Sequence, residues 1–327
     1  MDTLLDTFYL AIGGPNSRIW PIYLPGMILL AYFIYRKEKQ SGSFLGWLFP
    51  AKMYLHKSHI IDLQLFVVGR ILILLGVFQK IAIMSVGSAG TVALLGGYVS
   101  ADMDLSPWVI GLMLLLASDF STYWIHRVHH QHPTLWPFHA VHHSAEVMTP
   151  ITVYRKHPIY DVFSTLVRGV IVGVAQGLLL SLFVSEISIP LALGVNAFYM
   201  IFNSLTANLR HSHVWLSFGP VAEHIFISPA QHQVHHSIEL RHYNKNYGEV
   251  LAIWDWMFGT LYICAQREEI AFGLGDKDGN RIAQPHDSLR TALMVPIRQS
   301  LATLRRKPAA SAEPEVTPVS PPVTPAE

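Results

Sequence analysis

The sequence contains a single cysteine among its 327 residues, and charged residues make up only 14% of it. With Cys264 alone, an internal disulfide framework, a CxxC zinc site and a cysteine-ligated iron–sulfur cluster are excluded. The chain also lacks an excess of either charge, because its net charge is +1, so we expect no nucleic-acid partner. Any metal must therefore be bound through nitrogen or oxygen ligands.

Hydrophobic residues make up 51% of the chain, and their long runs predict an integral membrane protein. A helix needs about 20 apolar residues to cross the hydrocarbon core of a bilayer. We expect an all-α protein with about five spans, within residues 19–35, 63–99, 108–125, 159–184 and 187–209.

Segment 63–99 is too long for one helix and is interrupted by Arg70 and Lys80. Basic residues precede it, whereas Asp102 and Asp104 follow it, so its two ends are predicted to lie on opposite sides of the membrane. We therefore predict one crossing plus a re-entrant or interfacial piece, in the glycine-rich part around residues 87–97.

The charges that flank the spans predict the orientation of the protein. Basic residues follow the first, third and fifth predicted spans: Arg36, Lys37, Arg127, Arg155, Arg210 and Lys245. These ends are predicted to lie in the cytoplasm, which leaves Ser185 and Glu186 outside. We expect a multi-pass protein of a bacterial inner membrane.

Histidine is unusually frequent, with 18 residues in the chain, of which 14 fall between His126 and His236. Three clusters stand out, and the second and third repeat the pattern HxVHH. The clusters are His126, His129 and His130; His139, His142 and His143; and His232, His235 and His236.

Residues at positions i, i+3 and i+4 share one face of a helix, so the imidazoles of each cluster can converge on one or two cations. Three such faces in one apolar chain predict a metal centre at the cytoplasmic face. The isolated histidines are expected to be ordinary solvated side chains: His56, His59, His242 and His286.

Two segments resemble the membrane fatty acid hydroxylase and sterol desaturase superfamily. Residues 119–144, DFSTYWIHRVHHQHPTLWPFHAVHHS, resemble its pattern DxxxYWxHRxxHxxPxLWxFHxVHHS. Residues 232–237 and 245–262 resemble its closing pattern, HxVHHS followed by KNYGxxLxxWDxxFGTxY. The resemblance covers roughly residues 108–265, and it is highly specific.

The resemblance implies catalytic metal ligands at the boxes: His126, His130, His139, His142, His143, His232, His235 and His236. A further ligand usually precedes the third box, and here either His211 or His213 takes that place. Acyl hydroxylases of the family have another histidine where this chain has Ala207, so the full ligand set can differ, with His213, His129 or His157 as substitutes.

Three residues are candidates for a supporting role around the ligands: Asp119, His157 and His129. Asp119 lies seven residues before His126, on the same helical face. It could accept the outer N–H of a ligand imidazole, or it could pair with Arg127 or Arg70.

Imidazole alone suits zinc, copper, nickel and iron, so the ligands do not name the metal. Some nine histidines exceed what two closed zinc sites need, and the resemblance implies two iron ions that activate O2. We expect hydroxylation of a lipid in the bilayer, with electrons from a separate electron-transfer protein. Desaturation or ether cleavage would use the same site. A metal-dependent lipid hydrolase and a metal transporter are alternatives from other classes.

The resemblance and the composition together divide the chain into four parts. Residues 1–107 form an N-terminal membrane region with two spans and the re-entrant segment. Residues 108–265 form the hydroxylase-like catalytic domain, and residues 266–307 a cytoplasmic segment. Residues 308–327 are rich in Pro, Ala, Ser and Thr, and we expect a disordered tail.

Overall fold

The computed structural model describes residues 14, 17–78, 80–97, 103, 105–184, 186–188 and 197–305. The described part is helical, with isolated bridge pairs such as Phe226 with Leu251 in place of a sheet. The prediction of an all-α fold is therefore confirmed for these residues. The predicted tail, residues 308–327, lies outside them.

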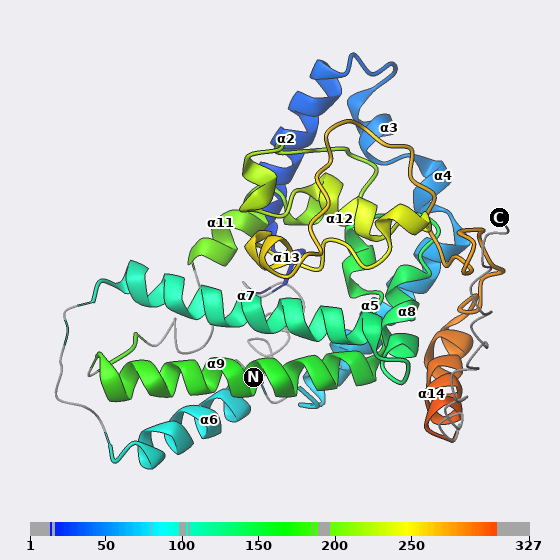
Figure 1. The fold of residues 1–327 in the computed structure, drawn as a ribbon. Coiled ribbons are helices and arrows are strands. Elements are labelled where there is room, and N and C mark those ends of the chain that lie inside the picture. Colours follow the sequence, from blue (N-terminus) through cyan, green and yellow to red (C-terminus); the bar gives the residue numbers. More distant parts are fainter. Residues whose placement is uncertain are drawn as a thin grey trace, which may run out of the picture.

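Two long antiparallel helices lie side by side at the base of the fold, α7 (Pro107–Gln131) and α9 (Pro158–Leu182) (Figure 1). Each begins with proline, and the N-cap side chains of Ser106 and His157 accept hydrogen bonds from backbone amides of the first turn. Each has 25 residues, or roughly 38 Å of helix. Among the described helices, these two are long and apolar enough to cross a membrane.

The N-terminal region consists of shorter helices than the sequence led us to expect. They are η1 (Pro21–Tyr23), α2 (Leu24–Lys37), α3 (Phe44–Leu48), α4 (Ala51–Tyr54), α5 (Lys57–Leu74) and α6 (Lys80–Leu94). Segment 63–99 is broken between α5 and α6, whereas its glycine-rich part belongs to the regular helix α6 as far as Leu94. The residues between α9 and α11 (Ala197–Leu205) are only partly described.

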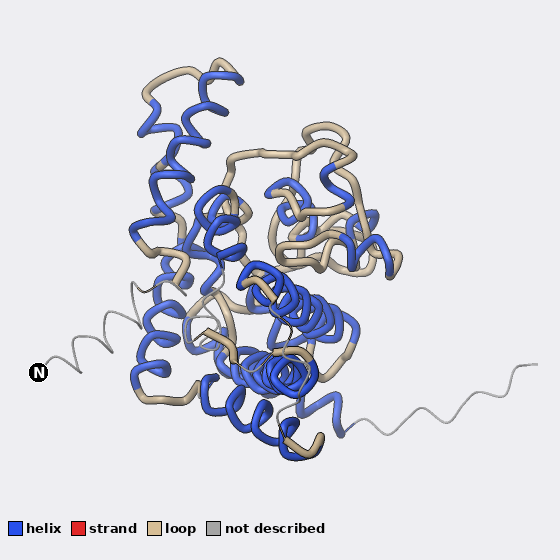
Figure 2. Tube along the Cα trace, turned by 90° about the vertical axis from the view of Figure 1, so that its left-hand side faces the viewer, coloured by secondary structure: helices blue, strands red, loops and turns tan. Residues whose placement is uncertain are grey.

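Helix α6 packs against α9 through glycines spaced four residues apart, Gly169, Gly173 and Gly177. A Cβ atom added at Gly173 would lie 2.5 Å from the carbonyl oxygen of Met84, and one at Gly177 would lie 2.5 Å from the Cβ of Thr91. Small residues let two helix backbones approach closely. The glycines of α9 therefore hold α6 alongside it, on the side away from α7 (Figures 1 and 2).

Most of the remaining described residues form shorter helices and loops. They are α8 (Trp136–His143), η2 (Pro150–Tyr154), η3 (Ala207–Leu209), η4 (Ala222–His224), α12 (Pro229–His235), η5 (Leu240–His242), α13 (Ile253–Met257) and α14 (Leu289–Arg305). Figure 2 looks nearly along α7 and α9 and shows the part of the chain from η3 to α13 above them. Helix α14 packs beside α8 and α5 through Val141, Ala292 and Leu65.

Candidate metal centre

Three helices present the predicted histidine boxes. His126 and His130 lie one turn apart near the C-terminal end of α7, and His139, His142 and His143 belong to α8. Helix α12 carries the third box and starts with a capping box, in which Ser228 and Gln231 each accept a hydrogen bond from the other's backbone amide. Local sequence signals thus fix where this short helix begins.

The histidines of the boxes, joined by His211, form two compact groups. The five-histidine group contains His126, His130, His139, His143 and His235, and the four-histidine group contains His142, His211, His232 and His236. Within each group, one nitrogen of every ring lies within 4.8 Å of those of the other rings. Both groups are buried, apart from the half-buried His130.

Each HxVHH box divides its side chains between the two groups. In α8, His139 and His143 enter the five-histidine group, and His142 enters the other. In α12 the division is reversed, because His235 alone enters the five-histidine group. The rings of His143 and His236 stack at 4.4 Å where the groups adjoin. The two groups therefore form one binuclear-type arrangement rather than two distant sites.

The nitrogen positions fit bound metal ions. Nε2 atoms lie 3.2 Å apart for His139 and His143, 3.2 Å for His142 and His211, and 3.0 Å for His211 and His232. Nitrogens that share one ion at roughly 2 Å lie roughly 3 Å apart. Within the described part of the chain, buried ring nitrogens without a hydrogen-bond partner occur in both groups, among them Nε2 of His126 in the first and Nε2 of His236 in the second. Such orphaned acceptors are expected where a cation binds.

Burial also keeps these rings in the form that binds metal. Desolvation lowers the pKa of His235 to about 4. Burial first, and the neighbouring histidines second, hold the pKa values of His143 and His236 well below the ordinary value. The rings are therefore neutral at pH 7, and neutral imidazole is the metal-binding form.

A loop that follows α12 orients one ligand candidate from each of two helices. The carbonyl oxygen of Tyr247 lies 2.8 Å from Nδ1 of His126, and that of Lys245 lies 2.7 Å from Nδ1 of His235. A carbonyl at Nδ1 accepts its N–H, which leaves Nε2 as the free acceptor toward the centre. Loop 244–251 thus sets the tautomer of both rings.

Two buried carboxylates hold this loop. Asp119 accepts hydrogen bonds from the backbone amides of Val250 and Leu251, both at 3.0 Å, and from the indole of Trp254. From the sequence, a ligand imidazole or an arginine was the expected partner of Asp119. In the structure, Asp119 on α7 instead bonds the backbone of the loop. Asp255 accepts from the amides of Tyr247 and Gly248.

The other candidates lie outside both groups. The ring of His213 packs edge-on against Trp47. His129 bonds the carbonyl oxygen of Ile125 in its own helix, at 2.7 Å. His157 caps α9, and its Nε2 lies 3.0 Å from the carbonyl oxygen of Leu293. Of His211 and His213, the structure thus brings only His211 among the boxes.

Three isolated histidines are buried, contrary to the expectation that they are solvated. His59 is 5% exposed and bonds Thr149, His286 is 1% exposed, and His242 lies 3.1 Å from Glu268. His56, the fourth, is half-buried and caps α5. Their burial results from contacts between distant parts of the chain, such as those of His59 with Thr149 and of His242 with Glu268, which histidine spacing does not reveal.

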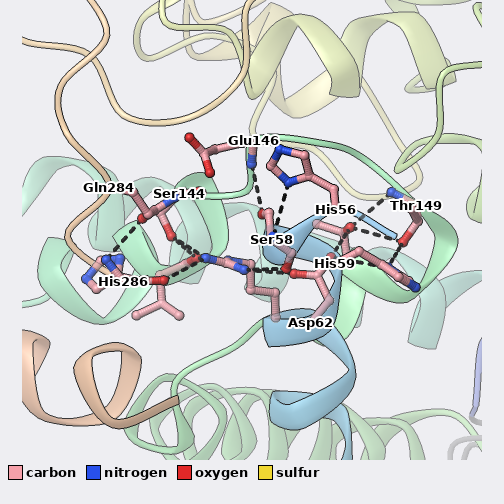
Figure 3. Close-up of polar contacts among 12 residues, drawn as sticks. His56, Ser58, His59, Asp62, Ser144, Glu146, Thr149, Gln284 and His286 are labelled. Carbon is pink, nitrogen blue, oxygen red and sulfur yellow. Dashed lines mark hydrogen bonds and ion pairs between the residues drawn. The ribbon is translucent and has the colours of Figure 1, made fainter. Parts of the chain in front are cut away.

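Arg155 is a supporting residue that the sequence did not identify. It is fully buried and donates to Asp62 at 2.9 Å, to the hydroxyl of Ser144, and to carbonyl oxygens of Ser58, Val141 and His286. Figure 3 shows this network, with Asp62, Ser144 and His286 labelled. Val141 and Ser144 lie within and directly after the second box. Arg155 therefore ties that box to α5 and to the C-terminal segment.

A cavity of about 200 Å³ opens onto both groups. Its walls include the rings of His126 and His139 from the five-histidine group and of His142, His211 and His232 from the other. A small molecule or part of a larger one can thus reach the centre from this side.

Comparison with known proteins shows which family the segment around this centre is similar to. Residues 111–260 match the fatty acid hydroxylase profile. Human alkylglycerol monooxygenase is 31% identical over 52% of this chain and 34% of its own length. Ornithine lipid hydroxylase OlsE of Rhizobium tropici is 34% identical over 47% of this chain and 41% of its own length. A sterol 5(6)-desaturase of Aspergillus fumigatus is 26% identical over 55% of this chain and 60% of its own length.

The chain thus spans less than half the length of the first two relatives. No solved structure matches it significantly. The profile match contains all nine histidines of the two groups. Residues 111–260 of this chain, which contain the centre, thus match the fatty acid hydroxylase family.

Proposed function

We propose that this protein is a membrane-bound di-iron oxygenase that hydroxylates a lipid. The observation that carries the proposal is the pair of adjoining histidine groups, buried and with orphaned nitrogens, inside the segment that matches the family. The named relatives include a lipid hydroxylase and an alkylglycerol monooxygenase, which supports a lipid substrate.

In the proposed reaction, one C–H bond of the lipid becomes C–OH. One atom of O2 enters the product, and the other leaves as water with two protons and two electrons. A separate electron-transfer protein supplies the electrons. Two iron ions, held by the five- and four-histidine groups, would supply the O2 activation that side-chain acids and bases cannot provide.

The residues of this chain perform the remaining tasks. The histidines hold the metals, and the carbonyl oxygens of Lys245 and Tyr247 orient His235 and His126. Asp119 and Asp255 keep the loop that carries those carbonyls in place. Burial of the rings excludes bulk water from the centre. The cavity beside both groups admits the substrate.

Ether cleavage is the second candidate, because alkylglycerol monooxygenase is among the relatives. It uses the same O2 chemistry: hydroxylation of the carbon next to an ether oxygen gives a hemiacetal that breaks down. Desaturation differs by removing two hydrogen atoms. These outcomes differ in the product and not in the metal centre.

Comparison of lipids from cells with and without the gene is expected to reveal one lipid class that gains an oxygen atom. The added atom should carry the label when the cells grow under isotopically heavy O2, because O2 is its source. Mass spectrometry of the extracted lipids measures both. Cells that express a His142→Ala variant at the same level serve as the control and should lack the product. A product that carries oxygen from water would contradict the oxygenase and favour a hydrolase.

We further propose five spans, with residues 108–265 as the catalytic unit and the centre on the cytoplasmic face of a bacterial inner membrane. Single cysteines at Glu186 and Leu240, both exposed, test the orientation in a Cys264→Ala background. An impermeant thiol reagent added to intact spheroplasts should label position 186, since the charge pattern places it outside. Position 240 should react only after lysis. Labelling of position 240 from outside would reverse the topology.

A further inference from the structure

The cavity beside the metal centre, called the chamber below, has strongly cationic walls. Five basic side chains line it: Arg18, Lys80, Lys156, Arg168 and Arg210. Only two acidic side chains do so, Asp161 and Glu249. An excess of positive charge in a low-dielectric space attracts an anionic ligand.

The charge of one of the two acids, Glu249, is balanced by arginines that also line the chamber. Glu249 lies 2.7 Å from Arg18 and 3.8 Å from Arg168, and its backbone carbonyl accepts from Arg210. Burial acts to raise the pKa of Glu249, but the surrounding arginines outweigh it and lower the pKa to about 2. Glu249 therefore stays ionised, and because the arginines balance its charge, it does not attract a cationic ligand.

The arginines retain donors that nothing in the described structure satisfies. Nη1 of Arg18, Nε of Arg168 and Nη2 of Arg210 are buried, and no hydrogen-bond partner among the described residues reaches them. Arg210 is only 3% exposed. Buried donors of a guanidinium are costly without an acceptor, so three such arginines in the walls of one chamber indicate an anionic acceptor there.

A second cavity, called the vestibule below, adjoins the chamber. Its volume is about 310 Å³, and it lies between α5, α6 and α9. Lys80, Lys156, Asp161 and Thr165 line both spaces. Beyond this junction the vestibule walls are largely apolar, with side chains such as Leu65, Phe66, Ile73 and Phe78.

We propose that the substrate is a lipid with an anionic group, a carboxylate or a phosphate, which binds in the chamber while its chain occupies the vestibule. This inference rests on the proposed function. The chamber, with a volume of about 200 Å³, is the smaller of the two spaces and suits a head group rather than a whole lipid. The oxidised carbon therefore lies close to the anionic group and not at the far end of an acyl chain.

Binding of hexadecyl phosphate to the full-length chain in neutral detergent tests the proposal. Lys156→Gln and Arg168→Gln should each weaken its binding about tenfold, because each removes a charged partner of the anion. Arg168→Lys should restore most of the binding. Arg290→Gln removes an exposed charge from α14 and should leave binding unchanged. Hexadecyl maltoside, which has the same chain and no charge, should bind weakly and equally to all variants.

The competing probes separate the parts of the proposal. Inorganic phosphate should displace hexadecyl phosphate only weakly, and displacement at equal concentration would overturn the role of the vestibule. Equal binding of the phosphate and the maltoside, or unchanged binding in both glutamine variants, would overturn the anion site. The measurement uses chelator-treated protein as well as metal-loaded protein. An oxygenase that oxidises a lipid but fails this binding test would keep the proposed function and lose the chamber assignment.

Discussion

Replacing His235 with alanine is expected to abolish oxidation of the lipid and to remove most of the bound metal. Nε2 of His235 is a buried nitrogen of the five-histidine group with no partner in the described structure, and Nδ1 is fixed by the carbonyl of Lys245. Loss of a residue that only orients a ligand typically costs 10- to 100-fold in metal affinity or activity. Loss of a ligand itself should exceed that. Metal analysis of the purified protein and lipid product formation measure the two effects.

A matched control separates the loss of a ligand from the loss of a histidine. His224 lies outside both groups and bonds the carbonyl oxygen of Pro220 in an exposed turn. His224→Ala should keep the metal content and the activity of the parent protein. Both variants should insert into the membrane equally well. A His235→Ala protein with full iron content and full activity would refute the assignment of this side chain as a ligand.

The Asp62→Ala substitution is expected to destabilise the fold more than any change on the surface. It leaves the guanidinium of Arg155, which is fully buried, without its only carboxylate partner in the described structure. Removing one partner of a buried ion pair costs about 3–5 kcal/mol. Because Arg155 also bonds Val141 and Ser144 around the second box, metal content should fall as well. Thermal unfolding in detergent and metal analysis measure both.

An exposed ion pair provides the comparison for Asp62. Lys57 and Asp287 lie 3.8 Å apart, with 72% and 53% of their side chains exposed. Asp287→Ala should change the free energy of unfolding by no more than about 1 kcal/mol. Similar stability of the Asp62→Ala and Asp287→Ala proteins would show that the buried network does not support the second box.

The spacing of the histidines identified most of the side chains that come together, because i, i+3 and i+4 positions share a helix face whatever the tertiary fold. Spacing also included His129, which lies outside both groups, whereas His211 was suggested only by the family resemblance. Spacing could not predict how the boxes divide. His139 and His232 occupy the same position in the repeated pattern but enter different groups. That outcome depends on how α8 and α12 face one another, which is a tertiary property.

Contacts between distant parts of the chain set the limit of what the sequence could predict. Asp62 and Arg155 are 93 residues apart, and nothing local to either residue indicates their pairing. Asp119 was recognised as unusual within an apolar helix, yet its partners lie more than 130 positions away in the loop at Val250. Segment 63–99 was recognised as too long for one helix and as interrupted at Lys80, where α6 begins, but its composition did not show that the glycine-rich part stays helical as far as Leu94.

The contact between α6 and α9 bears on how substrate preference can change. At Gly173 and Gly177 the backbones of α6 and α9 are already in contact. Because glycine has no side chain, a substitution there can only push the two helices apart. Lys80 on α6 and Arg168 on α9 face the chamber from these two helices. The spacing of the helices, and with it the width of the vestibule, therefore depends on glycines that line neither cavity. A change in the size of ligand that the vestibule admits can thus start at positions outside its walls.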